Sequence, residues 1–120
     1  MKLQKAVQLV KDLNQVTAEL NTINYKHNPA LGATMSIYTD SVAINSMLHN
    51  KGVGRLASFI LVASGTTPTN RPLLHTALMA TTHIATIKRI GYKRAILQDL
   101  GVSALSLVGG YLTTRKLKAY

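Results

Sequence analysis

The chain has 120 residues, of which 14 are Lys or Arg and 4 are Asp or Glu, so its net charge is +10, and 47% of the residues are hydrophobic. The length fits one domain or one subunit of a larger assembly, and the charge is typical of proteins that bind nucleic acid, an anionic membrane or an acidic protein. The absence of Cys excludes disulfide frameworks and thiolate metal sites, and the single Phe without any Trp argues against nucleic-acid binding by base stacking, so we expect neither a metal site nor a nucleic-acid partner.

The first 20 residues carry an apolar stripe at helical spacing. Its members recur every three or four positions: Leu3, Val7, Val10, Leu13, Val16 or Thr17, and Leu20. This spacing predicts an amphipathic helix, which either packs on its own protein, lies at a membrane interface or packs on a partner subunit. The following stretch, "HNPALGATMSIY", is predicted to be a loop because Pro29 interrupts helices. Residues 1–40 are therefore expected to lie outside a bilayer core.

Residues 41–120 contain three apolar segments, at about 42–65, 72–90 and 96–114, and no charge occurs from 73 to 87. Each segment is close to the roughly 20 residues that a spanning helix needs. They are rich in Ala, Thr, Ser and Gly, the small residues that line helix contacts in membranes. A soluble four-helix bundle is the alternative, but so short a chain has little interior in which to bury such segments. The predicted fold class is therefore all-α, a membrane protein with three transmembrane helices after an N-terminal amphipathic helix.

The basic residues predict an orientation. The N-terminal Lys residues and the loop "KRIGYKR" (88–94) are expected on one side, the matrix or cytoplasmic face. The loop "TTPTNRP" (66–72), with its single Arg, is expected on the opposite side.

Three motifs in this order, "HNPALGATMSIY", "SMLHNKGVG" and "GYKRAILQDLG", resemble the cytochrome b-type large membrane-anchor subunit of succinate dehydrogenase, respiratory complex II. That family typically carries S-x-x-H-R-x-(T/S)-G at the start of its first membrane helix and a motif ending in D-(L/F)-G before its third. The resemblance covers about residues 28–112 and rests on the order and spacing of the motifs.

The resemblance implies a ubiquinone site at the second motif. Ser46 and His49 match its Ser and His, while the Arg is replaced by Asn50 or, in the alignment from Tyr38, by Lys51. The resemblance therefore assigns quinone binding to Ser46, Lys51 and Asn50, because a hydroxyl and a cation offer donors to quinone oxygens in an apolar pocket. The alternative is that Asn50 and Lys51 cap a helix end at the interface.

Haem b is expected to be absent or atypical. The family's axial His lies eleven residues before the Asp of D-(L/F)-G, and Lys88 stands there in this chain. A charged Lys does not ligate iron, so His83, by a register shift, and His49 are the remaining haem candidates. A hydrogen-bonded interior His is the other interpretation of His83 and of His75.

The resemblance implies a non-catalytic subunit that anchors the iron–sulfur and flavoprotein subunits of complex II, beside a second small anchor subunit. Its location would be the mitochondrial inner membrane, or the bacterial inner membrane, in contact with lipids. Asp99 would pair with Lys93 or Arg94, or cap its helix in solvent. The alternative function is a structural accessory subunit of another mitochondrial membrane complex, with no ligand of its own.

Overall fold

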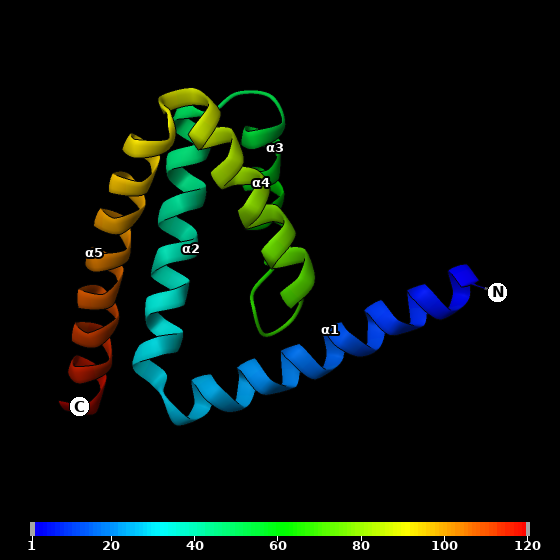
Figure 1. Ribbon diagram of the computed structural model, residues 1–120. Helices are drawn as coiled ribbons and strands as arrows, with labels where there is room; N and C mark the ends of the chain where they lie inside the picture. Colours follow the sequence, from blue (N-terminus) through cyan, green and yellow to red (C-terminus); the bar gives the residue numbers. More distant parts are fainter. Residues whose placement is uncertain (1, 120) are drawn as a thin grey trace.

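The protein folds into five α-helices in a computed structural model that describes residues 2–119, with side chains through residue 115. The helices are α1 (Lys2–His27), α2 (Pro29–His49), α3 (Val53–Ala63), α4 (Pro72–Ile90) and α5 (Tyr92–Ala119). No strand occurs among these residues, so the predicted all-α fold class is confirmed for this part of the chain. Helices α2 to α5 run alternately up and down, and α1 leaves this bundle as an arm (Figure 1).

Helix α2 begins where a loop was predicted. Pro29 occupies the first turn, where a missing N–H leaves no bond unmade and the fixed φ favours a helix. Asn28 caps the helix, since its side-chain oxygen accepts a hydrogen bond of 3.3 Å from the Leu31 N–H. The loop prediction for residues 27–38 was wrong because Pro29 starts a helix here and does not end one.

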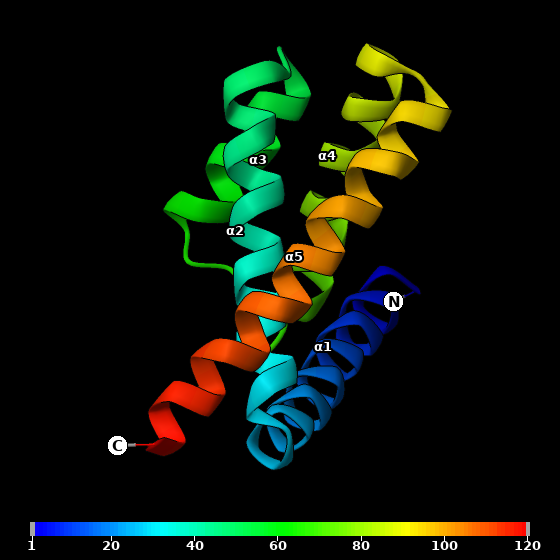
Figure 2. The ribbon, with the colours of Figure 1, turned by 90° about the vertical axis from the view of Figure 1, so that its left-hand side faces the viewer.

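The predicted single membrane helix over about 42–65 was also wrong, because the chain reverses at residues 50–52. Gly52 has φ of 59°, a left-handed conformation that favours glycine. α3 therefore runs back along α2, and the two helices form a hairpin (Figure 2).

Helix α2 lies at the centre of the bundle between α3 and α5, while α4 packs on α3. The backbones of α2 and α5 approach closely at Gly110, where an added Cβ would lie 2.7 Å from the Thr34 nitrogen and 2.9 Å from the Ala30 oxygen. The apolar core is small and consists of Val42, Ala43, Leu61 and Met79. Small residues thus let these helices approach each other closely.

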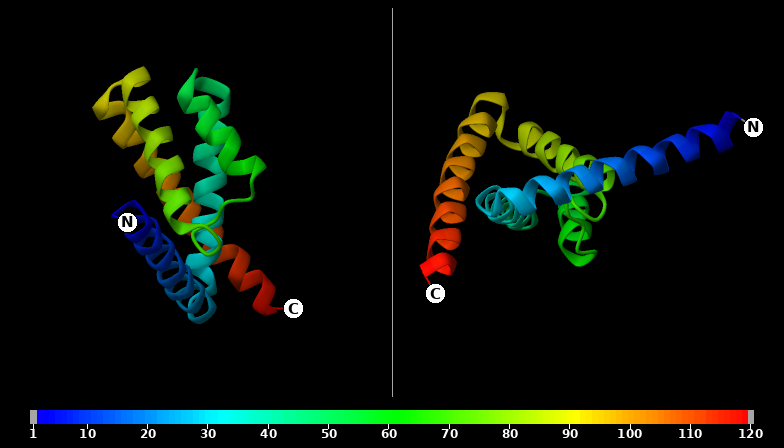
Figure 3. Two further views of the ribbon diagram at one scale, coloured as in Figure 1. Left: turned by 90° about the vertical axis from the view of Figure 1, so that its right-hand side faces the viewer. Right: turned by 90° about the horizontal axis from the view of Figure 1, so that it is seen from below.

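Helix α1 confirms the predicted N-terminal helix, which extends seven residues beyond Leu20, to His27, and has no buried residue. Its C-terminal half crosses the end of the bundle, where the Asn21 amide donates to the Pro68 oxygen at 2.6 Å and Asn14 Oδ1 accepts from the Leu73 N–H at 3.2 Å (Figure 3). Its apolar stripe is not covered by the described residues. Because Asn21 contacts the 64–71 segment, α1 and that segment lie at one end of the bundle. Loop 88–94 lies at the opposite end of α4, so the C-terminal half of α1 and this loop are at different ends of the bundle, and the predicted location of the N-terminal lysines and loop 88–94 on one side of a membrane stays a prediction.

By length and composition, one helix among the described residues could cross a membrane, over Tyr92–Arg115. α3 is apolar but has 11 residues. α2 and α4 are long enough, with 21 and 19 residues, but neither contains an 18-residue stretch that is apolar enough by the same measure.

Candidate functional site

Asn50, at the chain reversal, joins three helices. Its side chain is 1% exposed, and its amide donates to Ser46 Oγ at 2.8 Å and to Thr86 Oγ1 at 2.9 Å. Its side-chain oxygen accepts from Nε of Arg89 at 2.6 Å, and its backbone oxygen accepts from Nε of Arg55 at 3.1 Å. Every polar group of this buried amide is therefore satisfied, as burial requires.

Ser46 is fully buried in the same network. Its hydroxyl donates to the Gly54 oxygen at 3.1 Å and accepts from Ser58 at 2.8 Å as well as from Asn50. Gly54 is needed there, because a Cβ would overlap that of Ala85 on α4. Ser46 thus holds α2 against α3 and has no surface toward a cavity, so it does not have the exposed position that the predicted quinone contact requires.

Lys51 lies in the exposed turn and borders a cavity of about 600 Å³, hereafter the basic cavity. Its lining residues come from the end of α2, the start of α3 and one side of α4: His49, Asn50, Lys51, Val53, Gly54, Thr81, Ile84, Ala85, Lys88 and Arg89. No acidic residue lines it. The structure therefore brings Lys51 and Asn50 to one cavity, together with His49, Lys88 and Arg89.

The basic cavity changes character along α4. Lys88 and Arg89 stand at the helix end, while Thr81, Ile84 and Ala85 lie one to two turns further in. Cationic donors at one end and an apolar wall at the other suit a ligand with an oxygen-rich or anionic head and an apolar remainder. This is the chemistry that the site can recognise.

His49, His75 and His83 are not brought together in an arrangement that suits a bis-His haem. His83 Nε2 lies 3.2 Å from the Tyr38 hydroxyl, and His75 Nε2 lies 3.0 Å from the Thr39 hydroxyl, so both rings are engaged in interior hydrogen bonds. His49 lines the basic cavity, whereas His83 lines a different one. Since Lys88 also faces the basic cavity, the side chains present do not fit a bis-His haem.

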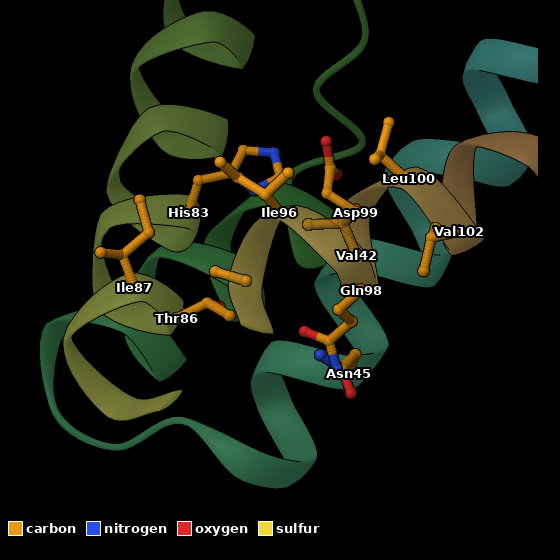
Figure 4. A pocket seen from close by; sticks show the side chains of 11 residues that line it. Val42, Asn45, His83, Thr86, Ile87, Ile96, Gln98, Asp99, Leu100 and Val102 are labelled. Atoms are coloured by element: carbon orange, nitrogen blue, oxygen red, sulfur yellow. The ribbon is translucent and has the colours of Figure 1, made fainter. Parts of the chain in front are cut away.

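A second polar cluster joins α2, α4 and α5. The Tyr38 hydroxyl donates to Asp99 and contacts His83, and the two rings stack with centroids 6.3 Å apart. His83 and Asp99 line a cavity of about 220 Å³, and Figure 4 shows their side chains among those that line it. The predicted pairing of Asp99 with Lys93 or Arg94 is not among the contacts of the described residues, because Tyr38 takes that place.

Sequence reasoning missed Tyr38, Thr86 and Arg89 as site residues. One feature of the sequence could have indicated Thr86 and Arg89. They place a hydroxyl and a cation about one turn apart, at the end of a helix that carries no charge from residue 73 to residue 87. Tyr38 was recognised only as part of a motif, and nothing local indicates its partners on α4 and α5.

No protein-family model, curated protein or solved structure matches the chain.

Proposed function

We propose that the chain is a membrane-anchor subunit of the succinate dehydrogenase type, with α2, α4 and α5 as its three membrane-spanning helices. In this role it docks the iron–sulfur and flavoprotein subunits to the mitochondrial or bacterial inner membrane, beside a second small anchor subunit. It is itself non-catalytic. The observation that carries the membrane part of the proposal is the distribution of polar and apolar side chains.

That distribution is inverted relative to a water-soluble bundle. Most of the buried side chains are polar: Thr34, Thr39, Ser46, Asn50, Ser58, Thr66, His75, Thr82, Thr86 and Ser106. Large apolar side chains face outward, and on α5 these are Tyr92, Ile96, Leu97, Leu100, Leu105, Leu107, Val108, Tyr111 and Leu112. Water would disfavour so much contiguous exposed apolar surface, whereas lipid accepts it. Small hydroxyl residues then join the helices inside.

The helix lengths support three spans. At 1.5 Å per residue, α2 and α4 extend about 31 and 28 Å, close to the roughly 30 Å of the hydrocarbon core. α3 extends about 16 Å and returns only part of the way. The 64–71 segment bonds its own polar groups, since Asn70 accepts from the Thr67 N–H at 2.7 Å and donates to the Gly65 oxygen at 2.8 Å. Such internal satisfaction is what irregular backbone near a membrane requires.

The basic cavity supports the quinone part of the proposal. Lys51 supplies a fixed positive charge that favours the semiquinone anion, Asn50 borders the cavity beside it, and Ile84 provides an apolar wall. Ser46 is left out of the proposed contacts because its hydroxyl is consumed inside the bundle. Ubiquinone is the ligand that the sequence resemblance indicates.

Co-purification tests the assembly, and two variants test the site. Flavoprotein and iron–sulfur subunits should be identified by mass spectrometry in the mildly solubilised complex, and their absence would refute the proposed family. Lys51→Ala should lower quinone reduction at least severalfold while succinate oxidation by a soluble dye stays intact. Lys93→Ala, a basic residue of the same bundle end that does not line the cavity, serves as the matched control.

An accessory subunit without a ligand is the second candidate. It is favoured by one observation, the complete use of Ser46 and Asn50 in interior hydrogen bonds. Unchanged quinone reduction in Lys51→Ala, together with co-purification in another respiratory complex, would support it.

A further inference from the structure

The outer face of the α2–α3 hairpin carries a groove of about 550 Å³, hereafter the outer groove. It is lined by Met47, Leu48, Gly52, Arg55, Leu56 and Phe59. Leu48, Leu56 and Phe59 are 68%, 56% and 58% exposed, so no described part of the chain covers them. The groove is apolar except for Arg55 near the start of α3, and it shares no residue with the basic cavity.

Arg55 is held in place by only one of its nitrogens. Its Nε donates to the Asn50 backbone oxygen at 3.1 Å, and its terminal amino groups have no partner among the described residues. Arg89 is bound to the same residue through Asn50 Oδ1 at 2.6 Å. One asparagine therefore holds two permanently charged guanidinium groups at this end of the bundle.

Nothing acidic offsets these charges nearby. No Asp or Glu lines the outer groove or the basic cavity, and Lys51 stands next to Asn50 in the turn. Concentrated positive charge of this kind attracts an anion, and a guanidinium with free terminal amino groups suits the paired oxygens of a phosphate.

We propose that the outer groove is a binding site for an acidic phospholipid. Arg55 pairs with the phosphate ester, and an acyl chain lies over Leu56 and Phe59. Both halves of the ligand follow from the site: a free phosphate would leave the exposed apolar wall uncovered, and a neutral lipid would leave the charge uncompensated. Basic residues at the end of membrane helices bind anionic head groups in the same way. The residues that line the outer groove differ from those that line the basic cavity, and the inference rests on the proposed membrane location but not on the quinone proposal.

Lipid binding to the full chain in neutral detergent micelles tests this, with phosphatidylglycerol and phosphatidylcholine as probes and native mass spectrometry as the readout. The chain should prefer phosphatidylglycerol severalfold, because both head groups carry a phosphate ester but only phosphatidylglycerol keeps a net negative charge beside Arg55. Arg55→Gln should abolish the preference. Arg94→Gln, which removes a charge at the same bundle end outside the groove, should retain it.

Leu56→Ser leaves the Arg55–Asn50 bond in place and should weaken phosphatidylglycerol binding severalfold. If circular dichroism shows that Arg55→Gln does not fold, Leu56→Ser alone tests the proposal. Equal affinity for the two lipids, or equal loss in Arg55→Gln and Arg94→Gln, would overturn the proposal in favour of unspecific surface charge. Displacement of phosphatidylglycerol by equimolar inorganic phosphate would overturn it in favour of a soluble anion.

Discussion

Asn50 and Arg89 are joined by a hydrogen bond of 2.6 Å between Oδ1 and Nε, although 39 positions separate them in the sequence. Through this bond, the turn between α2 and α3 is fixed to the last turn of α4. The polar stretch "SMLHNKGVGRL" therefore has a structural reason to interrupt an apolar region. Its buried polar members close a chain reversal, and two of its exposed members, the basic residues Lys51 and Arg55, stay at the surface, where the two proposed ligands would meet them.

Asn50→Ala should destabilise the protein. The substitution removes three side-chain hydrogen bonds, to Ser46, to Thr86 and from Arg89. At about 0.6 kcal/mol for each bond in a membrane protein, the loss is about 2 kcal/mol. Denaturant or thermal unfolding in detergent measures it.

Asn24→Ala is the matched control, because Asn24 is exposed on α1. Its unfolding free energy should stay within about 0.5 kcal/mol of the parent. If both variants lose the same stability, the network around Asn50 does not hold the hairpin together.

Two glycines of α5 should respond in opposite directions to substitution by Ala. At Gly110 the new Cβ meets backbone atoms of α2, at 2.7 and 2.9 Å, and α5 must shift. We expect a loss of about 1–3 kcal/mol. At Gly101 no atom lies within 4 Å, so Ala should stabilise the helix by up to about 1 kcal/mol. Equal effects in unfolding experiments would mean that α2 and α5 are not in this close contact.

The sequence was most informative where a helix had clear ends. The predicted segment 72–90 coincides with α4, because Pro72 opens it and Gly91, with φ of 87°, closes it. The predicted segment 96–114 lies within α5 but begins after its first turn, because the basic residues 93 and 94 were assigned to a loop. In the structure these two charged residues belong to α5, which is longer than its apolar part.

The first predicted membrane helix failed for a different reason. An apolar run on both sides of a short polar stretch fits one helix or a hairpin, and only tertiary contacts decide between them. Ser46 meets Ser58 and Gly54 across the hairpin, and Asn50 meets Thr86 on α4. These contacts also determine which polar side chains remain accessible. The hydroxyl of Ser46 is fully used in interior hydrogen bonds, whereas Lys51 stays exposed, and no local sequence pattern distinguishes the two residues.

The engaged histidines predict a complex without normal haem b in this subunit. Removing His83 from Tyr38, or His75 from Thr39, would break interior hydrogen bonds, and Lys88 takes the position of the axial ligand in the anchor-subunit family that the sequence resembles. A reduced-minus-oxidised spectrum of the purified complex should lack a stoichiometric bis-His b-type signal. A full signal that disappears in His83→Ala would contradict the expectation and identify His83 as a ligand, while His75→Ala serves as the control for general loss of packing.

Cysteine labelling tests the arrangement of the helix ends, since the chain has no Cys of its own. In sealed vesicles, single cysteines at Lys51 and Lys93 should react with an impermeant maleimide from one side, because the Asn50–Arg89 bond places the two turns at one end of the bundle. Cysteines at Lys26 and Arg71 should react from the other side, because α1 bonds to Pro68.

The pair Lys26 and Lys93 is decisive. The charge pattern of the sequence predicts that they share a side, whereas in the structure α2, α3 and α4 lie between them along the chain and the two positions are at opposite ends of the bundle. Labelling of both from the same side would restore the three-pass arrangement with one helix over 42–65, and opposite labelling requires the hairpin at residues 50–52.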